Sequence, residues 1–228
     1  MSVSALCRQT VLCRKYTVIR YPARLMPDSS SLVLATRNPG KVAEMRSLLA
    51  DVPVKLIPAD ALDDPPDVEE DRPTLEGNAR KKARALHAHA GHPALADDTG
   101  LEVAALDGAP GVLTARFAGP DATPADNNAK LLRALKDAHT RRARFRTVVA
   151  FVDDEGVHCF EGVCEGTIAG APRGKMGFGY DPLFIPDGAA NTFAEMTSDE
   201  KNAVSHRKQA LHRFVTFMRE RLASESAS

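Results

Sequence analysis

Two adjacent carboxylates that follow an apolar run are the side chains of this sequence best suited to hydrolytic chemistry. Residues 93–96 predict a buried strand, and Asp97 and Asp98 stand at its carboxyl end, followed by Thr99 and Gly100. That end of a strand is where open α/β sheets place their sites. Paired carboxylates can hold Mg²⁺ between hard oxygens, or one of them can take a proton from water. Because neighbouring like charges are costly without a cation, the pair favours a metal site; an exposed Asp-Asp-Thr-Gly turn is the alternative.

A second segment has the composition of an anion-binding site. Residues 32–36 predict a strand that ends in polar residues and a Pro-Gly turn, where an amphipathic helix begins at Pro39. Backbone N–H groups at a helix start are unpaired and favour a phosphate. Lys41 adds a charge there, and Thr36 and Asn38 add short polar side chains. The Walker A pattern is absent, and a simple helix cap at Asn38 is the alternative interpretation.

Residues 177–182, Gly-Phe-Gly-Tyr-Asp-Pro, could recognise a flat ligand such as a nucleobase. Glycine lets the backbone approach the ligand, and Phe178 and Tyr180 supply π-faces. Asp181 can accept hydrogen bonds from the N–H groups on a base edge. A tight turn with aromatic side chains in the core is the alternative.

The segment Ser205-His206-Arg207, preceded by Lys201, lies in the last predicted helix. Arg207 offers only hydrogen-bond donors, so it could read a purine carbonyl and would be left unpaired opposite an amino group. Solvated helix residues are the alternative for Lys201 and Arg207.

The elements that must position these segments interleave helices and strands. Strands are predicted over residues 32–36, 54–57, 93–96, 101–106, 143–153 and 157–169, the last two as a hairpin. Helices are predicted over residues 39–50, 75–90, 123–136 and 197–223. Thr74 and Thr197 each stand where they can cap a helix start. Since the alternation is not strict, we expect an α/β fold with a mixed sheet.

Composition excludes two classes of partner. The 228 residues include 30 basic and 30 acidic side chains, but residues 1–27 hold five of the basic ones and no acidic one. The remainder is therefore net acidic and lacks a basic stripe, so we expect no nucleic-acid partner. No apolar stretch approaches the ~18 residues that cross a bilayer, so we expect no membrane partner either.

The domain organisation follows from the same pass along the chain. We expect residues 1–28 to be a basic leader, residues 29–223 to form the domain, and residues 224–228 to be a tail. For the leader three interpretations stay open: an organelle-type transit segment, a disordered tail, or an over-extended N-terminus with Met26 as the true start, which we favour. Cys159 and Cys164 lie in one predicted strand without a second pair at metal spacing. That usage indicates a reducing compartment, and we expect the cytoplasm.

In their joint order and spacing, these segments closely resemble the inosine triphosphate pyrophosphatase family, over about residues 32–222. The segments that carry the resemblance are residues 36–41, 74–83, 96–100, 108–111 with 115–116, 177–182 and 205–207. The resemblance implies a two-lobed α/β fold, with a long central mixed β-sheet flanked by helices and an active-site cleft between the lobes. It also implies a homodimer and Mg²⁺-dependent hydrolysis of the purine nucleoside triphosphates ITP, dITP and XTP to the monophosphate and pyrophosphate.

The resemblance further implies roles for individual residues. Asp98 would be the catalytic carboxylate and a Mg²⁺ ligand, with Asp97 beside it at the metal. The implied substrate-binding residues are Thr36, Asn38, Lys41, Lys82, Thr99, Phe178, Gly179, Tyr180, Asp181, Lys201, His206 and Arg207. Phe178 would stack on the base, and Lys201, His206 and Arg207 would close around it.

The sequence departs from the family pattern at the metal. Many members carry a metal-binding glutamate directly before the Asn-Ala of the second segment, where this chain has Gly77 and offers Glu76 one residue earlier. One residue is ~100° of helix, so Glu76 becomes the metal ligand only if the helix start is irregular. Two alternatives stay open: a Maf-like nucleotide pyrophosphatase, and a catalytically dead nucleotide-binding module, which Gly77 alone favours.

Overall fold

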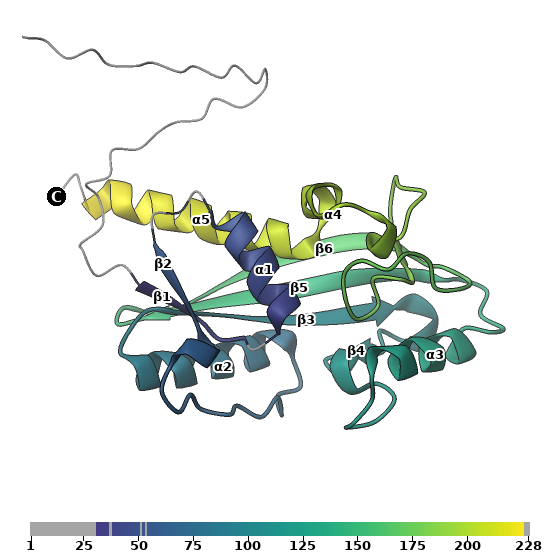
Figure 1. Ribbon diagram of the computed structural model, residues 1–228, viewed down its shortest axis with the longest axis horizontal. Coiled ribbons are helices and arrows are strands. Elements are labelled where there is room, and N and C mark those ends of the chain that lie inside the picture. Colours follow the sequence, from purple (N-terminus) through teal and green to yellow (C-terminus); the bar gives the residue numbers. More distant parts are fainter. Residues whose placement is uncertain (1–30, 37, 51, 53, 226–228) are drawn as a thin grey trace, which may run out of the picture.

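Within the residues that the computed structural model describes, which are 31–36, 38–50, 52 and 54–225, seven strands form one mixed sheet flanked by helices (Figure 1). The strands are β1 (Ser31–Leu34), β2 (Lys55–Pro58), β3 (Ala94–Val103), β4 (Pro110–Gly111), β5 (Arg142–Asp153), β6 (Gly156–Ile168) and β7 (Phe184–Pro186). The helices are α1 (Pro39–Leu48), α2 (Leu75–Ala90), α3 (Pro124–Ala134), α4 (Ser198–Val204) and α5 (His206–Glu225). None of these helices is long and apolar enough to cross a bilayer.

The sheet has the order β2-β1-β3-β5-β6-β7, and β4 pairs with β3. β1 runs parallel to β2 and to β3, whereas every other pairing is antiparallel. The long hairpin β5–β6 turns at residues 154–155, between the two strands predicted to form it. The expectation of a mixed sheet is therefore confirmed.

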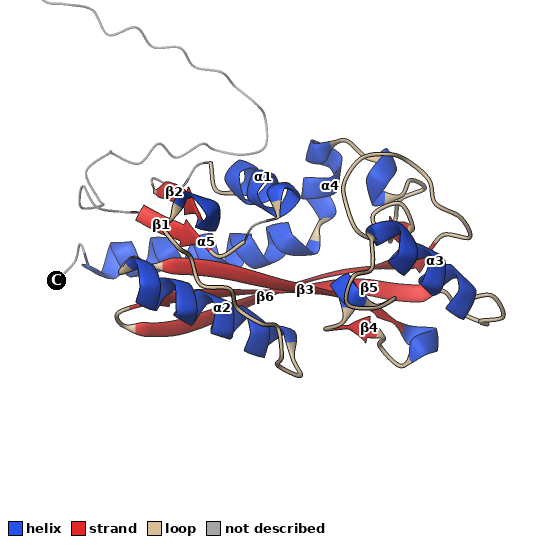
Figure 2. Ribbon diagram, turned by 60° about the horizontal axis from the view of Figure 1, so that its bottom comes forward, coloured by secondary structure: helices blue, strands red, loops and turns tan. Residues whose placement is uncertain are grey.

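Helices α1 and α5 pack on one face of the sheet, and α2 packs on the other (Figure 2). Successive side chains of a strand point to opposite faces, so β3 and β5 supply both layers. One layer joins Met45, Leu95, Val149, Phe151, Leu211 and Phe214. The other joins Leu75, Ala79, Ala83, Ala96, Val148 and Ala150, whose small residues let α2 lie close to the sheet.

The far end of the sheet forms a second lobe around its own apolar cluster. This cluster includes Leu101, Val103, Leu131, Leu135, Phe145, Tyr180, Phe184 and Phe193. The cluster contains residues of α3, β7 and the loop that carries the predicted base-binding segment. The two-lobed architecture expected from the family resemblance is confirmed.

Two differences from the predicted elements affect the residues of the candidate site. β3 runs unbroken from Ala94 to Val103, so Asp97 and Asp98 lie in mid-strand instead of at a strand end. The last predicted helix is two helices, because Ser205 adopts an extended conformation (φ −69°, ψ 146°) between α4 and α5. The Ser205 hydroxyl accepts a hydrogen bond from the Lys208 N–H at 3.1 Å, which is the geometry of a helix cap.

The predicted leader, residues 1–28, lies outside the described residues. α5 runs to Glu225, into the stretch 224–228 that the sequence predicts as a tail.

Candidate active site

A cavity of about 490 Å³ opens beside β3. It lies along the part of β3 that follows its pairing with β1 and precedes its pairing with β4. β1 ends at Leu34, level with Leu95, and β4 pairs only with Leu101 and Glu102. The walls include every predicted catalytic and substrate-binding residue: Thr36, Asn38, Lys41, Lys82, Asp97, Asp98, Thr99, Phe178, Gly179, Tyr180, Asp181, Lys201, His206 and Arg207. Segments from both ends of the chain thus meet at one opening.

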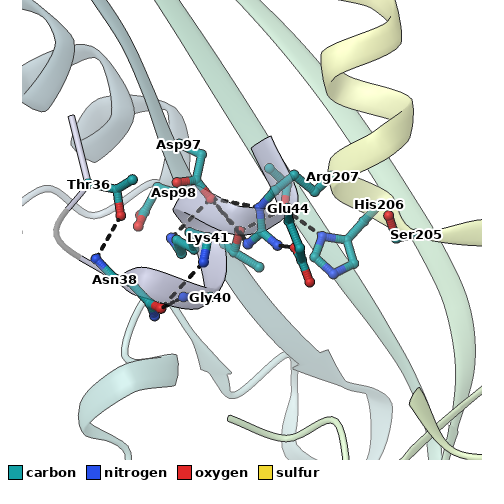
Figure 3. A network of polar contacts seen from close by, with 12 residues as sticks. Thr36, Asn38, Gly40, Lys41, Glu44, Asp97, Asp98, Ser205, His206 and Arg207 are labelled. Carbon is teal, nitrogen blue, oxygen red and sulfur yellow. Dashed lines mark hydrogen bonds and ion pairs between the residues drawn. The ribbon is translucent and has the colours of Figure 1, made fainter. Parts of the chain in front are cut away.

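Asp97 and Asp98 reach this cavity from opposite faces of β3. Asp97 lies on the side of α1 and α5, where its carboxylate is 3.0 Å from the Lys41 ammonium and 3.3 Å from the Arg207 guanidinium (Figure 3). Asp98 lies on the side of α2, where it accepts hydrogen bonds from Asn78 and Lys82, both at 3.2 Å. The strand alternation that separates the two core layers also separates these neighbours.

The different surroundings give the two carboxyl groups opposite pKa shifts. Burial acts to raise the pKa of Asp97, but the charges of Lys41 and Arg207 outweigh it and hold this pKa well below its usual range. For Asp98, burial and the nearby Glu70 carboxylate raise the pKa despite the opposing charge of Lys82. Asp97 is therefore a fixed anion, and Asp98 is the carboxylate whose affinity for a proton is increased.

The start of α1 supplies the polar rim of the cavity. The Asn38 side chain accepts hydrogen bonds from the N–H groups of Gly40 and Lys41, at 2.9 and 3.4 Å, so Asn38 caps α1. The Asn38 N–H donates to the Thr36 hydroxyl at 3.2 Å. These contacts fix the turn that carries Lys41 (Figure 3).

Glu44, which sequence reasoning missed, joins α1 to the residues of α4 and α5. Its carboxylate pairs with the Lys201 ammonium at 2.8 Å and with the Arg207 guanidinium. Burial raises the pKa of Glu44, but Arg207 and Lys201 outweigh this and lower it, so Glu44 stays ionised. The available signal was helix spacing, since Glu44 follows Lys41 by three residues and shares its face of α1.

Phe178 forms the aromatic wall of the cavity beside two cations. The Lys201 ammonium lies 4.9 Å from its ring centroid, and the Arg207 guanidinium lies 5.7 Å away. A side chain at Gly40 would come within 2.7 Å of the Phe178 ring, so glycine is needed where α1 meets this wall.

Asp181 holds the loop that carries Phe178. Its Oδ2 atom accepts a hydrogen bond from the Phe178 N–H at 2.8 Å and from Lys201 at 2.7 Å. Gly177 has φ +74°, and a Cβ atom there would lie 2.1 Å from the same carboxylate, so only glycine fits. Burial raises the pKa of Asp181 against the opposing charge of Lys201.

Glu76, predicted as a metal ligand, does not line the cavity that the other predicted site residues share. Thr74 caps a regular helix start by accepting from the Gly77 N–H, which leaves Glu76 half-exposed and paired with Arg80 at 2.7 Å. Glu70, from the loop before α2, lines the cavity instead and pairs with Lys82 at 2.7 Å. Sequence gave no signal for Glu70 because it lies in a run of acidic residues, 67 and 69–71.

Comparison with known proteins finds relatives that are similar in sequence and in fold. A dITP/XTP pyrophosphatase of Porphyromonas gingivalis is 48% identical over 188 residues, which cover 82% of this chain and 96% of that protein. A dITP/XTP pyrophosphatase of Syntrophobacter fumaroxidans is 52% identical over 185 residues, covering 81% of this chain and 80% of that protein. The solved structure of a HAM1 protein from Coxiella burnetii matches with a TM-score of 0.77 at 46% identity, covering 83% of this chain and 98% of that one.

The sequence model of one family matches nearly the whole described part of the chain. Residues 32–217 match the Ham1 family model, and they contain every residue of the cavity named above. The resemblance drawn from the sequence is confirmed: this chain belongs to the Ham1 family.

Proposed function

We propose that this protein hydrolyses deaminated purine nucleoside triphosphates, namely ITP, dITP and XTP, to the monophosphate and pyrophosphate, with Mg²⁺ as cofactor. One observation carries the proposal: Asp98 opens into the same cavity as Lys41, Lys82 and the Phe178 ring. Relatives that are 48% and 52% identical are named dITP/XTP pyrophosphatases, which supports the same substrates.

The triphosphate would occupy the cationic end of the cavity. Lys41 and Lys82 are the ammonium groups at that end, and both are held by carboxylates that a phosphate oxygen would replace or join. The base would lie at the other end, stacked on Phe178 and close to Lys201 and Arg207.

The residues present fit a Mg²⁺ ion that is shared with the substrate. Glu70 and Asp98 both contact the single ammonium of Lys82, at 2.7 and 3.2 Å, so one cation already bridges the two carboxylates. The Oδ1 atom of Asp97 is buried and has no hydrogen-bond partner among the described residues. Among those residues no cluster of three or more His, Cys, Asp or Glu side chains is arranged as a complete metal site. Mg²⁺ commonly uses one or two carboxylates plus substrate phosphates, which is what this arrangement offers.

Asp98 would act as the general base of the reaction. Its raised pKa suits it to take a proton from water. The water oxygen forms a bond to the α-phosphorus while the bond from that phosphorus to the bridging oxygen breaks, and pyrophosphate leaves with the electron pair. Lys41 and Lys82 lie where they can stabilise the charge on the phosphates. When bound, Mg²⁺ would neutralise further phosphate charge.

Substrate choice would come from buried hydrogen-bond donors at the base. Lys201 and Arg207 have donors and no acceptors, so they match the 6-oxo group of hypoxanthine or xanthine. The amino group of adenine would leave these donors unpaired, and such mismatches cost up to roughly 10⁴–10⁵-fold in kcat/KM.

The proposal includes a homodimer in the cytoplasm, where the nucleotide pool lies, without a nucleic-acid or membrane partner. The family resemblance supports the dimer. Light scattering of the purified protein tests it, and a monomer at micromolar concentration would contradict it.

Pyrophosphate release from ITP, XTP, GTP, ATP and TTP, with and without Mg²⁺, tests the function. We expect rapid release from ITP and XTP only when Mg²⁺ is present. Preference for TTP would instead favour the Maf-like alternative. Tight ITP binding without any pyrophosphate release would favour the catalytically dead module, and equal turnover of ATP and ITP would contradict the roles of Lys201 and Arg207.

A further inference from the structure

A chain of hydrogen bonds runs along one face of the sheet, from Asp97 of β3 through Thr99 and Thr147 to His206. Thr99 of β3 is paired directly with Thr147 of β5, so their side chains lie on one face. The Thr99 hydroxyl is 3.2 Å from the Asp97 Oδ2 atom and 2.7 Å from the Thr147 hydroxyl. The Thr147 hydroxyl is in turn 2.6 Å from the His206 Nδ1 atom. Thr147 is fully buried, and the catalytic scheme above gives it no role.

The protons of this chain can be assigned one by one. The Asp97 carboxylate is held ionised by Lys41 and Arg207 and can only accept, so the Thr99 proton must point to it. Thr99 then has no second proton, so Thr147 must donate to Thr99. Thr147 has then used its own proton, and the contact with His206 requires a proton on Nδ1.

We propose that Thr147 is a positioning residue that fixes His206 in the Nδ1–H tautomer and leaves its Nε2 atom as a hydrogen-bond acceptor toward the cavity. The sign of the charge on Asp97 sets the direction of every bond between them. A protonated or neutral group at position 97 would remove that direction.

The surroundings of His206 favour a neutral imidazole in one orientation, so its tautomer matters. Burial lowers the pKa of His206 well below its ordinary value, and the neighbouring charges of Arg207 and Lys201 lower it further. A neutral imidazole carries one N–H, and its two nitrogens therefore have opposite hydrogen-bonding roles. The Phe145 ring stacks on the imidazole at a centroid distance of 4.8 Å, which restricts its rotation.

The consequence for the substrate rests on the proposed function. His206 lines the cavity, and its Nε2 atom has no hydrogen-bond partner among the described residues. As an acceptor, Nε2 would accept a hydrogen bond from an N–H group of the base and could not donate one to a carbonyl oxygen. The donors to the 6-oxo group would then come from Lys201 and Arg207 alone.

Nitrogen-15 NMR of the histidine-labelled protein at neutral pH tests the tautomer without any substrate. The His206 signals are assigned by their loss in His206→Gln. We expect protonated Nδ1 and bare Nε2 in the wild-type protein and in Thr147→Ser, which keeps the hydroxyl. In Thr147→Val, which has the same shape without the hydroxyl, we expect the population to move toward Nε2–H. An Nε2–H tautomer in the wild-type protein, or an unchanged tautomer in Thr147→Val, would overturn the proposal.

Kinetics with ITP give a second readout. Loss of one buried hydrogen bond predicts a rise in KM of up to about tenfold in Thr147→Val, with kcat nearly unchanged and with recovery in Thr147→Ser. An equal rise in both variants would overturn the role of the hydroxyl. Because the NMR result does not depend on turnover, failure of the proposed function and failure of this assignment are distinguishable.

Discussion

Asp97 and Asp98 are neighbours in sequence with different partners, because β3 sends their side chains to opposite faces. Asp97 meets two cations at 3.0 and 3.3 Å and remains an anion that organises Lys41, Arg207 and Thr99. Asp98 contacts the Lys82 ammonium, which also pairs with the Glu70 carboxylate, and the pKa of Asp98 is raised. The two carboxyl groups therefore have opposite pKa shifts, and Asp98 is the one that the proposed mechanism uses as a base.

The raised pKa of Asp98 predicts a pH dependence. The base must be ionised, so kcat/KM for ITP should fall as the pH is lowered through the pKa of Asp98. Since burial raises that pKa, the acid limb should lie above the ordinary aspartate value of about 3.9. The profile is measured at low Mg²⁺, because a bound cation favours the ionised carboxylate. A limb at or below the ordinary value, in protein that circular dichroism reports as folded, would contradict this role.

Glu70 and Glu76 form a matched pair of glutamates for testing the metal. Glu70→Gln should raise the Mg²⁺ concentration for half-maximal activity by about tenfold or more, because Glu70 shares the Lys82 cation with Asp98. Glu76→Gln should leave that concentration unchanged, since Glu76 is paired with Arg80 away from the cavity. A Mg²⁺ titration of both variants measures this. A larger effect in Glu76→Gln would reverse the assignment.

At the scale of elements, the close approach of α5 to β6 sets the position of His206 and Arg207. A Cβ atom at Gly162 of β6 would lie 1.9 Å from the His206 carbonyl oxygen and 2.7 Å from the Ala210 nitrogen. Both are backbone atoms of α5, so a side chain there must displace the helix. Gly162 therefore supports the site without contacting the cavity.

Gly162→Ala should lower the free energy of unfolding by about 1–3 kcal/mol and raise KM for ITP, because overpacking shifts α5. Urea denaturation and steady-state kinetics measure the two effects. Gly170→Ala is the control, since a Cβ atom there meets nothing within 4 Å, and its stability should stay within about 0.5 kcal/mol of wild type. Equal stability of the two variants would show that α5 can move without cost.

Elements whose signals are local were predicted well from the sequence. α2 spans residues 75–90 as predicted, with Thr74 as its N-cap, and the predicted hairpin of β5 and β6 is present. The break between α4 and α5 was missed because Ser205 carries neither the φ restriction of proline nor the freedom of glycine. The available signal was the residue type, since serine is a preferred N-cap and Ser205 caps the N–H of Lys208, three residues later.

The course of β3 could not be predicted from local sequence. Two charged residues in a buried strand are unfavourable unless partners neutralise them, so the aspartates were interpreted as a strand end. Their partners are Lys41, Lys82 and Arg207, which come from α1, α2 and α5. The outward position of Glu76 has a similar cause: the regular, capped start of α2 turns it toward Arg80, and Glu70 lines the cavity in its place.

At the scale of the molecule, the sheet joins two lobes and leaves one opening between them. α1 and α2 supply Lys41 and Lys82 from one lobe, and the 177–181 loop supplies Phe178 from the other (Figure 1). α4 and α5 supply further residues of the cavity wall. Lys201 binds both Glu44 and Asp181, at 2.8 and 2.7 Å, and so ties the lobes together at the cavity. This assembly predicts that binding and catalysis can be separated at Asp98.

Asp98→Asn, measured beside the wild-type protein for both ITP binding and pyrophosphate release, tests that claim most directly. We expect the variant to bind ITP with an affinity close to wild type while pyrophosphate release with Mg²⁺ falls by about 10²–10⁴-fold, the usual contribution of a general base. A variant that still releases pyrophosphate at the wild-type rate would contradict the account.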